Sequence, residues 1–332
     1  DQERGNYDYL MGADVDTDNP TVREELTANS NMVEGCRMKL GGRESSVAQL
    51  SDRVNKISVE ARSMDSRIAM LSEMEKDYEG YSKAVKTVMR EAGRGNLKGV
   101  HAPVANLIRA EDEFALAIET ALGAAGQNIV VDTQNDGRRA IELLKKYDSG
   151  RATFLPVDTI RGNVMRDAPV NDPGFVGIAS ELAQYDAKYK DIFENLLGRT
   201  VIAEAMTDAI RISKNNGNRL RIVTLDGQLI NAGGSMTGGS SAKGTGIISR
   251  ANELEKLRKQ REKLAENEKS YTQQLERAKT DLAAVRYQLD MKLEEQAEIK
   301  SRLSSLEAEK RAVESSAAQL KLLLESLTGD SQ

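Results

Sequence analysis

The chain has 332 residues, of which only 4% are aromatic and 30% are charged, a composition typical of long exposed helices. Its net charge of −5 arises from residues 1–30, which carry eight acids against two bases. The nearly neutral remainder therefore gives no global sign of a nucleic-acid binder. The single cysteine, Cys36, lies on an apolar stripe, where we interpret it as a small core residue. One cysteine excludes an internal disulfide and favours a reducing compartment.

Two features of the composition bear on localisation. No apolar run approaches the ~20 residues needed to span a bilayer, and no signal peptide is visible. We therefore expect a cytosolic protein.

The chain opens with an acidic segment, residues 1–19, which shows no helical period and is expected to be irregular. Asn19 is a favourable N-cap and Pro20 a favourable first helical residue, so together they predict a helix start. Gly41 and Gly42 each weaken a helix by roughly 1 kcal/mol relative to alanine, and they predict a local break.

Residues 20–78 form the first predicted arm. Apolar side chains recur there at steps of four and three, and among the 15 grid positions only Asn29 and Arg43 are polar. Such a heptad stripe winds helices into a left-handed coiled coil. The apolar positions are Val22, Leu26, Val33, Cys36, Leu40, Val47, Leu50, Val54, Ile57, Ala61, Met64, Ile68 and Leu71.

Residues 248–332 form the second predicted arm. Between Leu254 and Leu327, 17 of 22 core positions are apolar. Two arms that flank one globule can meet only if the chain folds back, so the helices are predicted to pair antiparallel. The first stripe should be about 75 Å long and the second about 110 Å. The excess of the second arm has no obvious partner in the chain.

The central block, residues 79–247, changes period and alternates between strand-like and helix-like segments, which indicates an α/β globule. The predicted strands are Gly99–Ile108, Asn128–Asp132, Ala152–Pro156, Phe175–Ile178, Thr200–Ala203 and Leu220–Leu225. The predicted helices are Tyr81–Glu91, Glu111–Leu122, Gly137–Tyr147, Ala187–Leu197 and Met206–Asn215. The polar segment Arg161–Gly174 predicts a linker between two subdomains, residues 79–160 and 175–247.

Glycine is concentrated around one run, Gly233-Gly234-Ser235-Met236-Thr237-Gly238-Gly239. A phosphate-binding loop is one interpretation, but Ser240 stands where the P-loop pattern requires lysine. No helix opens directly after the run, as a dinucleotide fingerprint requires. The other interpretation is close approach of a second backbone, which glycine permits because it has no Cβ. In a capping domain that backbone would belong to a second copy.

Catalytic chemistry has little support in this sequence. His101 is the only histidine, and no G-x-S-x-G elbow accompanies it. One histidine and one cysteine far apart do not make an ordinary zinc site. We interpret His101 as a strand residue and expect this chain to be no enzyme.

One basic cluster occurs where the globule gives way to the second arm. Seven bases and three acids lie between Lys243 and Lys263. Such bases can neutralise DNA phosphates without reading sequence. A normally charged coiled-coil surface is the competing interpretation, and sequence alone slightly favours it. The candidate DNA-binding residues are Lys243, Arg250, Lys256, Arg258 and Lys259.

The central block resembles the hinge domain of bacterial SMC (structural maintenance of chromosomes) proteins, and the flanking stripes resemble that family's coiled-coil arms. Four segments in the family's order carry the resemblance, and the run GGSMTGG after V-T-L-D-G is its most specific part. These segments are Gly99–Ile108 (GVHAPVANLI), Ala117–Val131, Gly150–Pro156 (GRATFLP) and Ile222–Gly239.

The resemblance implies a homodimer whose hinges pair edge strands, with the glycine run 233–239 at the contact. It implies a role in chromosome condensation and segregation and non-specific contact with double- or single-stranded DNA. ATP and Mg would bind at the heads of a parent ATPase, whose motifs this chain lacks, and accessory condensin subunits would bind elsewhere in that parent. The chain itself is expected to need no cofactor, to contact no membrane and to associate with the nucleoid.

One departure from the family weakens the DNA expectation, since Lys243 alone stands where relatives often carry a run of lysines. Two alternative functions remain open. One is the apex dimerisation domain of another DNA-repair coiled-coil ATPase, although the zinc-hook form needs a CxxC that is absent here. The other is a nucleotide-binding domain carried on a rod.

Overall fold

The computed structural model describes residues 15–240 and 246–329, and the chain divides into two compact units, Asp1–Glu60 with Leu264–Gln332 and Ala61–Lys263. The helices are α2 (Val15–Lys76), α3 (Lys83–Gly93), α4 (Asp112–Leu122), α5 (Gln134–Lys146), α6 (Ala179–Leu182), α7 (Lys190–Leu197), α8 (Met206–Asn215) and α9 (Ile247–Gly329). The strands are β1 (Val100–Pro103), β2 (Ile108–Ala110), β3 (Ile129–Val131), β4 (Phe154–Pro156), β5 (Phe175–Ile178), β6 (Ala183–Tyr185), β7 (Thr200–Ala203), β8 (Arg221–Thr224), β9 (Leu229–Ile230) and β10 (Met236–Thr237). Short 3-10 helices are η1 (Val104–Asn106), η2 (Gly123–Gln127) and η3 (Ala187–Tyr189).

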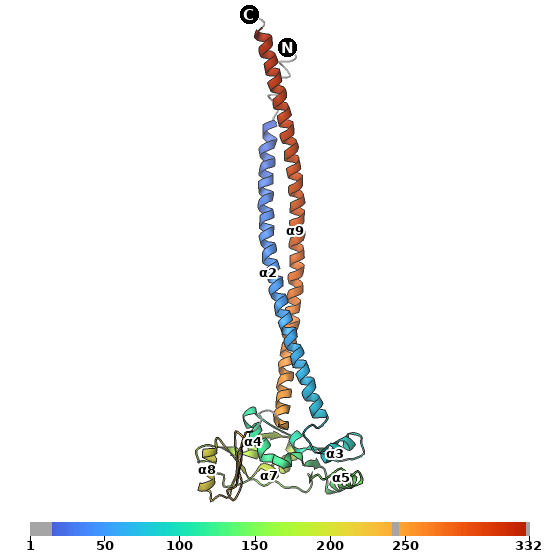
Figure 1. The fold of residues 1–332 in the computed structure, drawn as a ribbon, viewed down its shortest axis with the longest axis vertical. Coiled ribbons are helices and arrows are strands. Elements are labelled where there is room, and N and C mark those ends of the chain that lie inside the picture. The colour runs from blue at the N-terminus through green and yellow to red at the C-terminus, as the bar shows by residue number, and fades with distance from the viewer. Residues whose placement is uncertain (1–14, 241–245, 330–332) are drawn as a thin grey trace. The chain divides into compact units, whose positions relative to one another are not determined.

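In the first unit, α2 and α9 lie side by side (Figure 1). Arg23 pairs with Glu307 at 3.0 Å and Arg43 with Asp281 at 3.8 Å. Residues further along α2 therefore meet residues nearer the start of α9, and the predicted antiparallel pairing is confirmed. The predicted apolar positions of α2 in this unit are all buried or half-buried, including Cys36.

Two details of the first arm differ from the prediction. Helix α2 begins at Val15, before Asn19 and Pro20. The expectation of an irregular segment is therefore wrong for residues 15–19, because a nucleated helix propagates at the cost of fixing only one residue per hydrogen bond. Helix α2 also runs through Gly41 and Gly42 without interruption, and the predicted break is wrong. The reason is that tertiary packing of the apolar stripe outweighs the helix propensity of single residues.

The second unit contains a five-stranded sheet in the order β10-β9-β8-β7-β5, a three-stranded sheet β1-β3-β4 and a two-stranded sheet β2-β6. The β3–β4 and β7–β8 pairs are parallel and the others are antiparallel. The mixed α/β globule is therefore confirmed. Strands β5 and β7 and helix α8 lie where they were predicted. The predicted strand Gly99–Ile108 is instead divided by η1, and its second half continues as β2.

Three apolar clusters fill this unit. One contains residues that precede the segment 161–174, such as Ile129, and another lies mainly on the five-stranded sheet, around Ile222. The third cluster joins both sides, because Ile118 of α4 and Phe193 of α7 are both fully buried in it. Strand β2 also pairs with β6 across the same segment. The five-stranded and three-stranded sheets therefore share a core.

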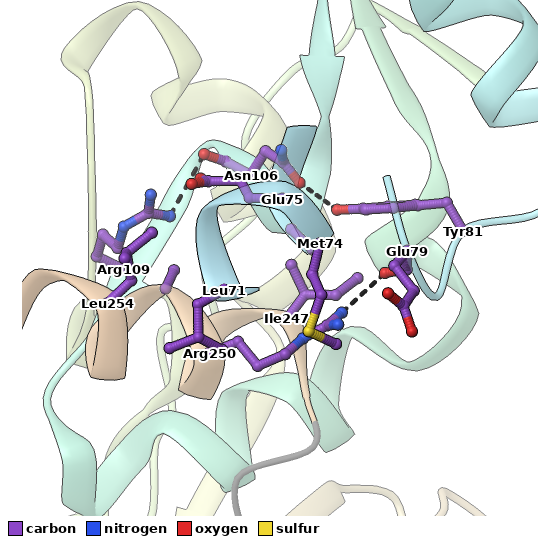
Figure 2. A pocket seen from close by; sticks show the side chains of 12 residues that line it. Leu71, Met74, Glu75, Glu79, Tyr81, Asn106, Arg109, Ile247, Arg250 and Leu254 are labelled. Carbon is purple, nitrogen blue, oxygen red and sulfur yellow. Dashed lines mark hydrogen bonds between the residues drawn. The ribbon is translucent and has the colours of Figure 1, made fainter. Parts of the chain in front are cut away.

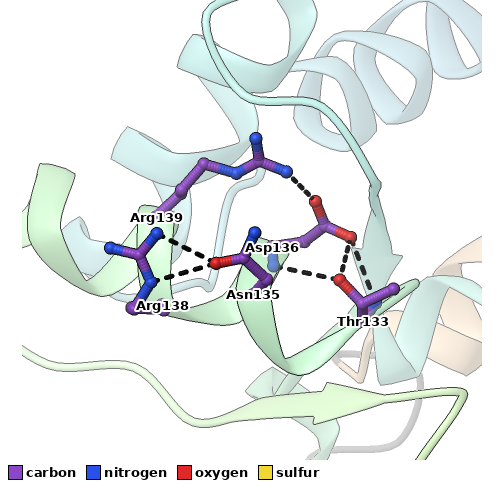
Figure 3. A network of polar contacts seen from close by, with 5 residues as sticks. All are labelled: Thr133, Asn135, Asp136, Arg138 and Arg139. Carbon is purple, nitrogen blue, oxygen red and sulfur yellow. Dashed lines mark hydrogen bonds and ion pairs between the residues drawn. The ribbon is translucent and has the colours of Figure 1, made fainter.

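Helix α5 has a complete capping box at its start (Figure 3). Asp136 donates its backbone N–H to the Thr133 hydroxyl at 3.2 Å, and Thr133 donates its own N–H to the Asp136 carboxylate at 3.1 Å. The Thr133 hydroxyl, which also donates to this carboxylate, holds the pKa of Asp136 below its ordinary value. The box fixes where α5 begins, and the helix runs from there to Lys146, with Tyr147 as C-cap.

Candidate dimer and nucleic-acid interfaces

The glycine run folds as the turn and second strand of a hairpin made by β9 and β10. Gly233 and Gly234 have φ values of +95° and +90°, in the region that favours glycine. Gly234 donates its N–H to the Asn231 carbonyl at 2.9 Å, which closes the turn. A Cβ added at either glycine would meet no atom within 4 Å. The turn's own backbone geometry thus explains these two glycines.

Strand β10 lies at the end of its sheet and pairs only with β9 among the described residues. Asn231 donates its N–H to the Ser235 carbonyl at 2.8 Å, so these two residues form a hydrogen-bonded pair. Pairs alternate along an antiparallel ladder, and the next pair, Ile230 with Met236, is therefore of the other kind. The N–H and C=O of Met236 consequently point away from β9 toward the free edge.

The side chains along this edge are also exposed. Met236 keeps 54% of its surface accessible, and residues 232–240 are all classed as exposed. An exposed edge strand presents unpaired backbone groups to a second chain. The predicted interface residues Gly233, Gly234, Ser235, Met236, Thr237, Gly238 and Gly239 thus form one continuous exposed segment.

Gln228 holds the far end of the segment and was not predicted from sequence. Its side-chain oxygen accepts the Gly239 N–H at 2.8 Å, and its amide nitrogen donates to the Gly239 carbonyl at 3.1 Å. A Cβ on Gly238 would lie 2.0 Å from that same oxygen. The close approach expected at Gly238 is therefore made by a side chain of the same chain.

The predicted DNA-binding residues do not gather into one free basic surface. Lys243 lies outside the described residues. Arg250 donates to the Glu79 carbonyl at 2.8 Å, Arg258 donates to the Ser72 hydroxyl at 3.1 Å, and Lys259 pairs with Glu255 at 2.7 Å. Lys256 is exposed and has no ion pair within the described ranges.

The formal charges around Lys256 and Lys259 cancel. These two residues line a groove of about 370 Å³ together with a third base, Arg109, and three acids. The acids are Glu111, Asp112 and Glu255. The positive sum seen along the sequence is therefore neutralised by acids from other segments.

Arg250 has a structural role at the base of α9 (Figure 2). It lies beside a cavity of about 30 Å³, which has room for about one water molecule. On the same cavity, Tyr81 donates its hydroxyl proton to Asn106, and burial raises the pKa of Tyr81. The cavity is too small to be a ligand site.

Glu119 of α4 caps the start of α9. One of its carboxylate oxygens accepts the Ser249 N–H at 2.9 Å, and burial raises the pKa of Glu119 above its ordinary value. Gly246 lies so close that a Cβ there would be 1.7 Å from the other carboxylate oxygen. These two residues connect the globule to the arm helix, and no local sequence pattern indicated the contact.

His101 lies in β1, as predicted, and its ring nitrogens lie 2.7 Å from the Tyr189 hydroxyl and 2.6 Å from Asp132. Residues 15–240 and 246–329 contain no cluster of three or more His, Cys, Asp or Glu side chains arranged to hold a metal. Over those same ranges no helix combines the length and the apolar character needed to cross a membrane.

The fold and exposed edge define a hinge globule of the kind that joins coiled-coil arms. The family model "SMC proteins Flexible Hinge Domain" matches residues 97–213. The solved SMC hinge domain of Geobacillus stearothermophilus is 37% identical, with a TM-score of 0.64, and the match covers 75% of this chain and 99% of that one. This chain belongs to the SMC hinge family.

Two curated relatives match a similar part of the chain. The chromosome partition protein Smc of Bacillus subtilis (strain 168) is 41% identical over 204 residues, or 60% of this chain. That of Desulfitobacterium hafniense (strain Y51) is 39% identical over 203 residues, or 58% of this chain. The match spans 17% of the length of each relative.

Proposed function

We propose that this chain is a homodimerisation hinge that joins two antiparallel coiled-coil arms. The free edge of β10 is the observation that carries the proposal, since the Met236 backbone groups point outward and nine consecutive residues, 232–240, are exposed. The related Geobacillus stearothermophilus hinge is described as an asymmetric dimer, which supports self-association here, and the two-fold symmetry of the pairing is part of our proposal. Each copy would pair its β10 edge with an edge strand of the other copy.

Two such contacts would close a ring. In a symmetric dimer the same contact occurs twice, so two short and individually weak interfaces act together. This arrangement suits β10, which offers only two residues for strand pairing. The parent protein would be a chromosome partition ATPase that binds ATP and Mg at its heads, associates with the nucleoid and meets its accessory subunits elsewhere.

Sedimentation equilibrium of the chain over a concentration series tests dimerisation. A monomer has a mass of 36.4 kDa, so a dimer should approach twice that value. A mass that stays at the monomer value at every concentration would contradict the proposal.

Contact with DNA at the junction of globule and arm is a second proposal. It is supported by Lys256, which is exposed and unpaired within the described part of the chain, and by the neighbouring Lys259. Replacing both with glutamine should weaken DNA binding at low salt. Unchanged affinity would remove this part of the proposal.

A further inference from the structure

A second groove of the globule, which shares no lining residue with the groove at Lys256, is strongly basic. It has a volume of about 650 Å³ and runs along α3, with Tyr147 and Ser149 on its other side. Its charged lining residues are Lys83, Lys86, Arg90, Arg94 and Glu91. The four bases are spaced by three, four and four residues, so they follow one face of the helix and its C-cap.

The bases are poorly compensated. Glu91 is the only acid in the lining, and it is buried and fully engaged, since Asn96 donates to it at 2.7 Å and Arg94 at 3.1 Å. Lys83 and Lys86 are exposed and have no ion pair within the described residues. Asp148 lies nearby but offers Lys83 only its carbonyl oxygen, at 3.4 Å. The groove thus keeps a net charge of +3, four bases less one acid.

The opposite side of the groove presents an aromatic ring. Tyr147 is 48% exposed, and the Lys146 ammonium lies 5.9 Å from its ring centroid. The ring is positioned by the end of α5, where Tyr147 is the C-cap. An exposed ring opposite a row of cations combines the two elements that bind single strands, stacking for a base and charge for the phosphates.

We propose that this α3 groove binds single-stranded nucleic acid, with Lys83, Lys86, Arg90 and Arg94 contacting phosphates and Tyr147 stacking on a base. Eleven residues of helix rise place the row of bases over about 16 Å. One strand, at about 3.4 Å per nucleotide, carries about five phosphates over that length. A concave groove of this size takes one strand more readily than the convex surface of a duplex.

This inference is independent of dimerisation and concerns a site other than the junction around Lys256. The two basic sites differ in charge balance, because the junction groove has three acids for its three bases. Separate variants therefore distinguish failure of the α3 groove, failure of the junction contact and failure of the dimer.

The test measures binding of a short fluorescein-labelled oligo(dT) to the full chain by anisotropy over a range of salt. The variant Lys83→Gln with Lys86→Gln is the informative one, because changing Arg90 or Arg94 would also remove an ion-pair partner of buried Glu91. Two lost phosphate contacts should reduce the slope of log affinity against log salt by about 1.4, at about 0.7 per contact for single strands. At about 50 mM salt this corresponds to roughly 60-fold weaker binding, since 0.05 raised to −0.7 is about 8 per contact.

The matched control replaces two exposed lysines outside the groove, Lys188→Gln with Lys214→Gln, and should leave the slope unchanged. Tyr147→Ala should weaken single-strand binding by about 5- to 150-fold, and Tyr147→Phe should restore it. An unchanged slope in the Lys83 and Lys86 variant would overturn the site. Equal affinity for a duplex of the same length, with no effect of Tyr147→Ala, would overturn the assignment to single strands. Sedimentation of each variant reports dimerisation separately.

Discussion

Replacing Met236 by proline is the sharpest test of the β10 edge. The Met236 N–H points toward the free edge and makes no bond in the β9–β10 hairpin. Proline has no N–H, so the variant removes an intermolecular donor while every hairpin hydrogen bond can remain. The monomer should therefore unfold at nearly the same temperature as the unmodified chain.

The expected loss of dimer affinity follows from the exposed groups. One hydrogen bond contributes about 1 kcal/mol. Met236 is 54% exposed, and covering about half of a methionine side chain contributes about 1 kcal/mol more. The contact occurs twice in a symmetric dimer, so the total is about 4 kcal/mol, or about a thousandfold increase in Kd.

Sedimentation equilibrium over a concentration series measures that change. Met236→Ala is the matched control, because it loses the side-chain burial and keeps the backbone donor, and it should show a smaller increase of about 30-fold. If Met236→Pro dimerises with an unchanged Kd, β10 is not part of the interface and the edge-pairing argument is refuted.

Three further variants test the supporting structure. Gly234→Ala should destabilise the hairpin by about 1–2 kcal/mol, seen as a lower Tm, because φ is +90° there; an unchanged Tm would show that the turn relaxes. Glu119→Gln should flatten the decline in stability that begins as pH rises above about 4. The raised pKa of Glu119 makes the folded chain bind this proton more tightly, so stability falls as pH rises through that pKa; an unaltered urea-unfolding pH profile would contradict this. Asn29→Leu should raise the unfolding free energy by about 1 kcal/mol, because relief of the buried Asn29 side-chain oxygen, which has no partner among the described residues, outweighs loss of the amide bond to the Lys292 carbonyl at 3.2 Å; a lower Tm by circular dichroism would count against this.

The arms and the fold class were predictable because they rest on periodicity. A heptad stripe fixes which residues pack together, and the apolar positions from Val22 to Ile57 are buried or half-buried as expected. Strands β6 and β10 were not predicted, because neither lies in a longer strand-like run. Strand β6 has three residues and β10 has two, too few for a period of two to be recognised.

Several contacts of α9 join residues far apart in sequence. Glu119 caps α9 at Ser249, 130 residues further on, and no local signal marks either partner. Arg261 falls on a core position of the heptad stripe, and the structure shows that it donates to Asp65 of the opposing helix at 2.8 Å. Sequence can flag such a residue as irregular, but identifying its partner requires the register of the two helices.

Charge is the property for which the linear sequence misleads most. The bases from Lys256 to Lys259 form a positive run along the chain, yet in space Glu111 and Asp112 join Glu255 beside them. Along α3 the bases are separated in the sequence by mostly apolar residues. In the folded helix the bases lie on one face, and most of the residues between them are buried. A phosphate backbone responds to the summed field at a surface, which falls off within about 10 Å at about 0.1 M salt. A search for a nucleic-acid site must therefore add charges over a folded face, and on that measure the α3 groove exceeds the junction.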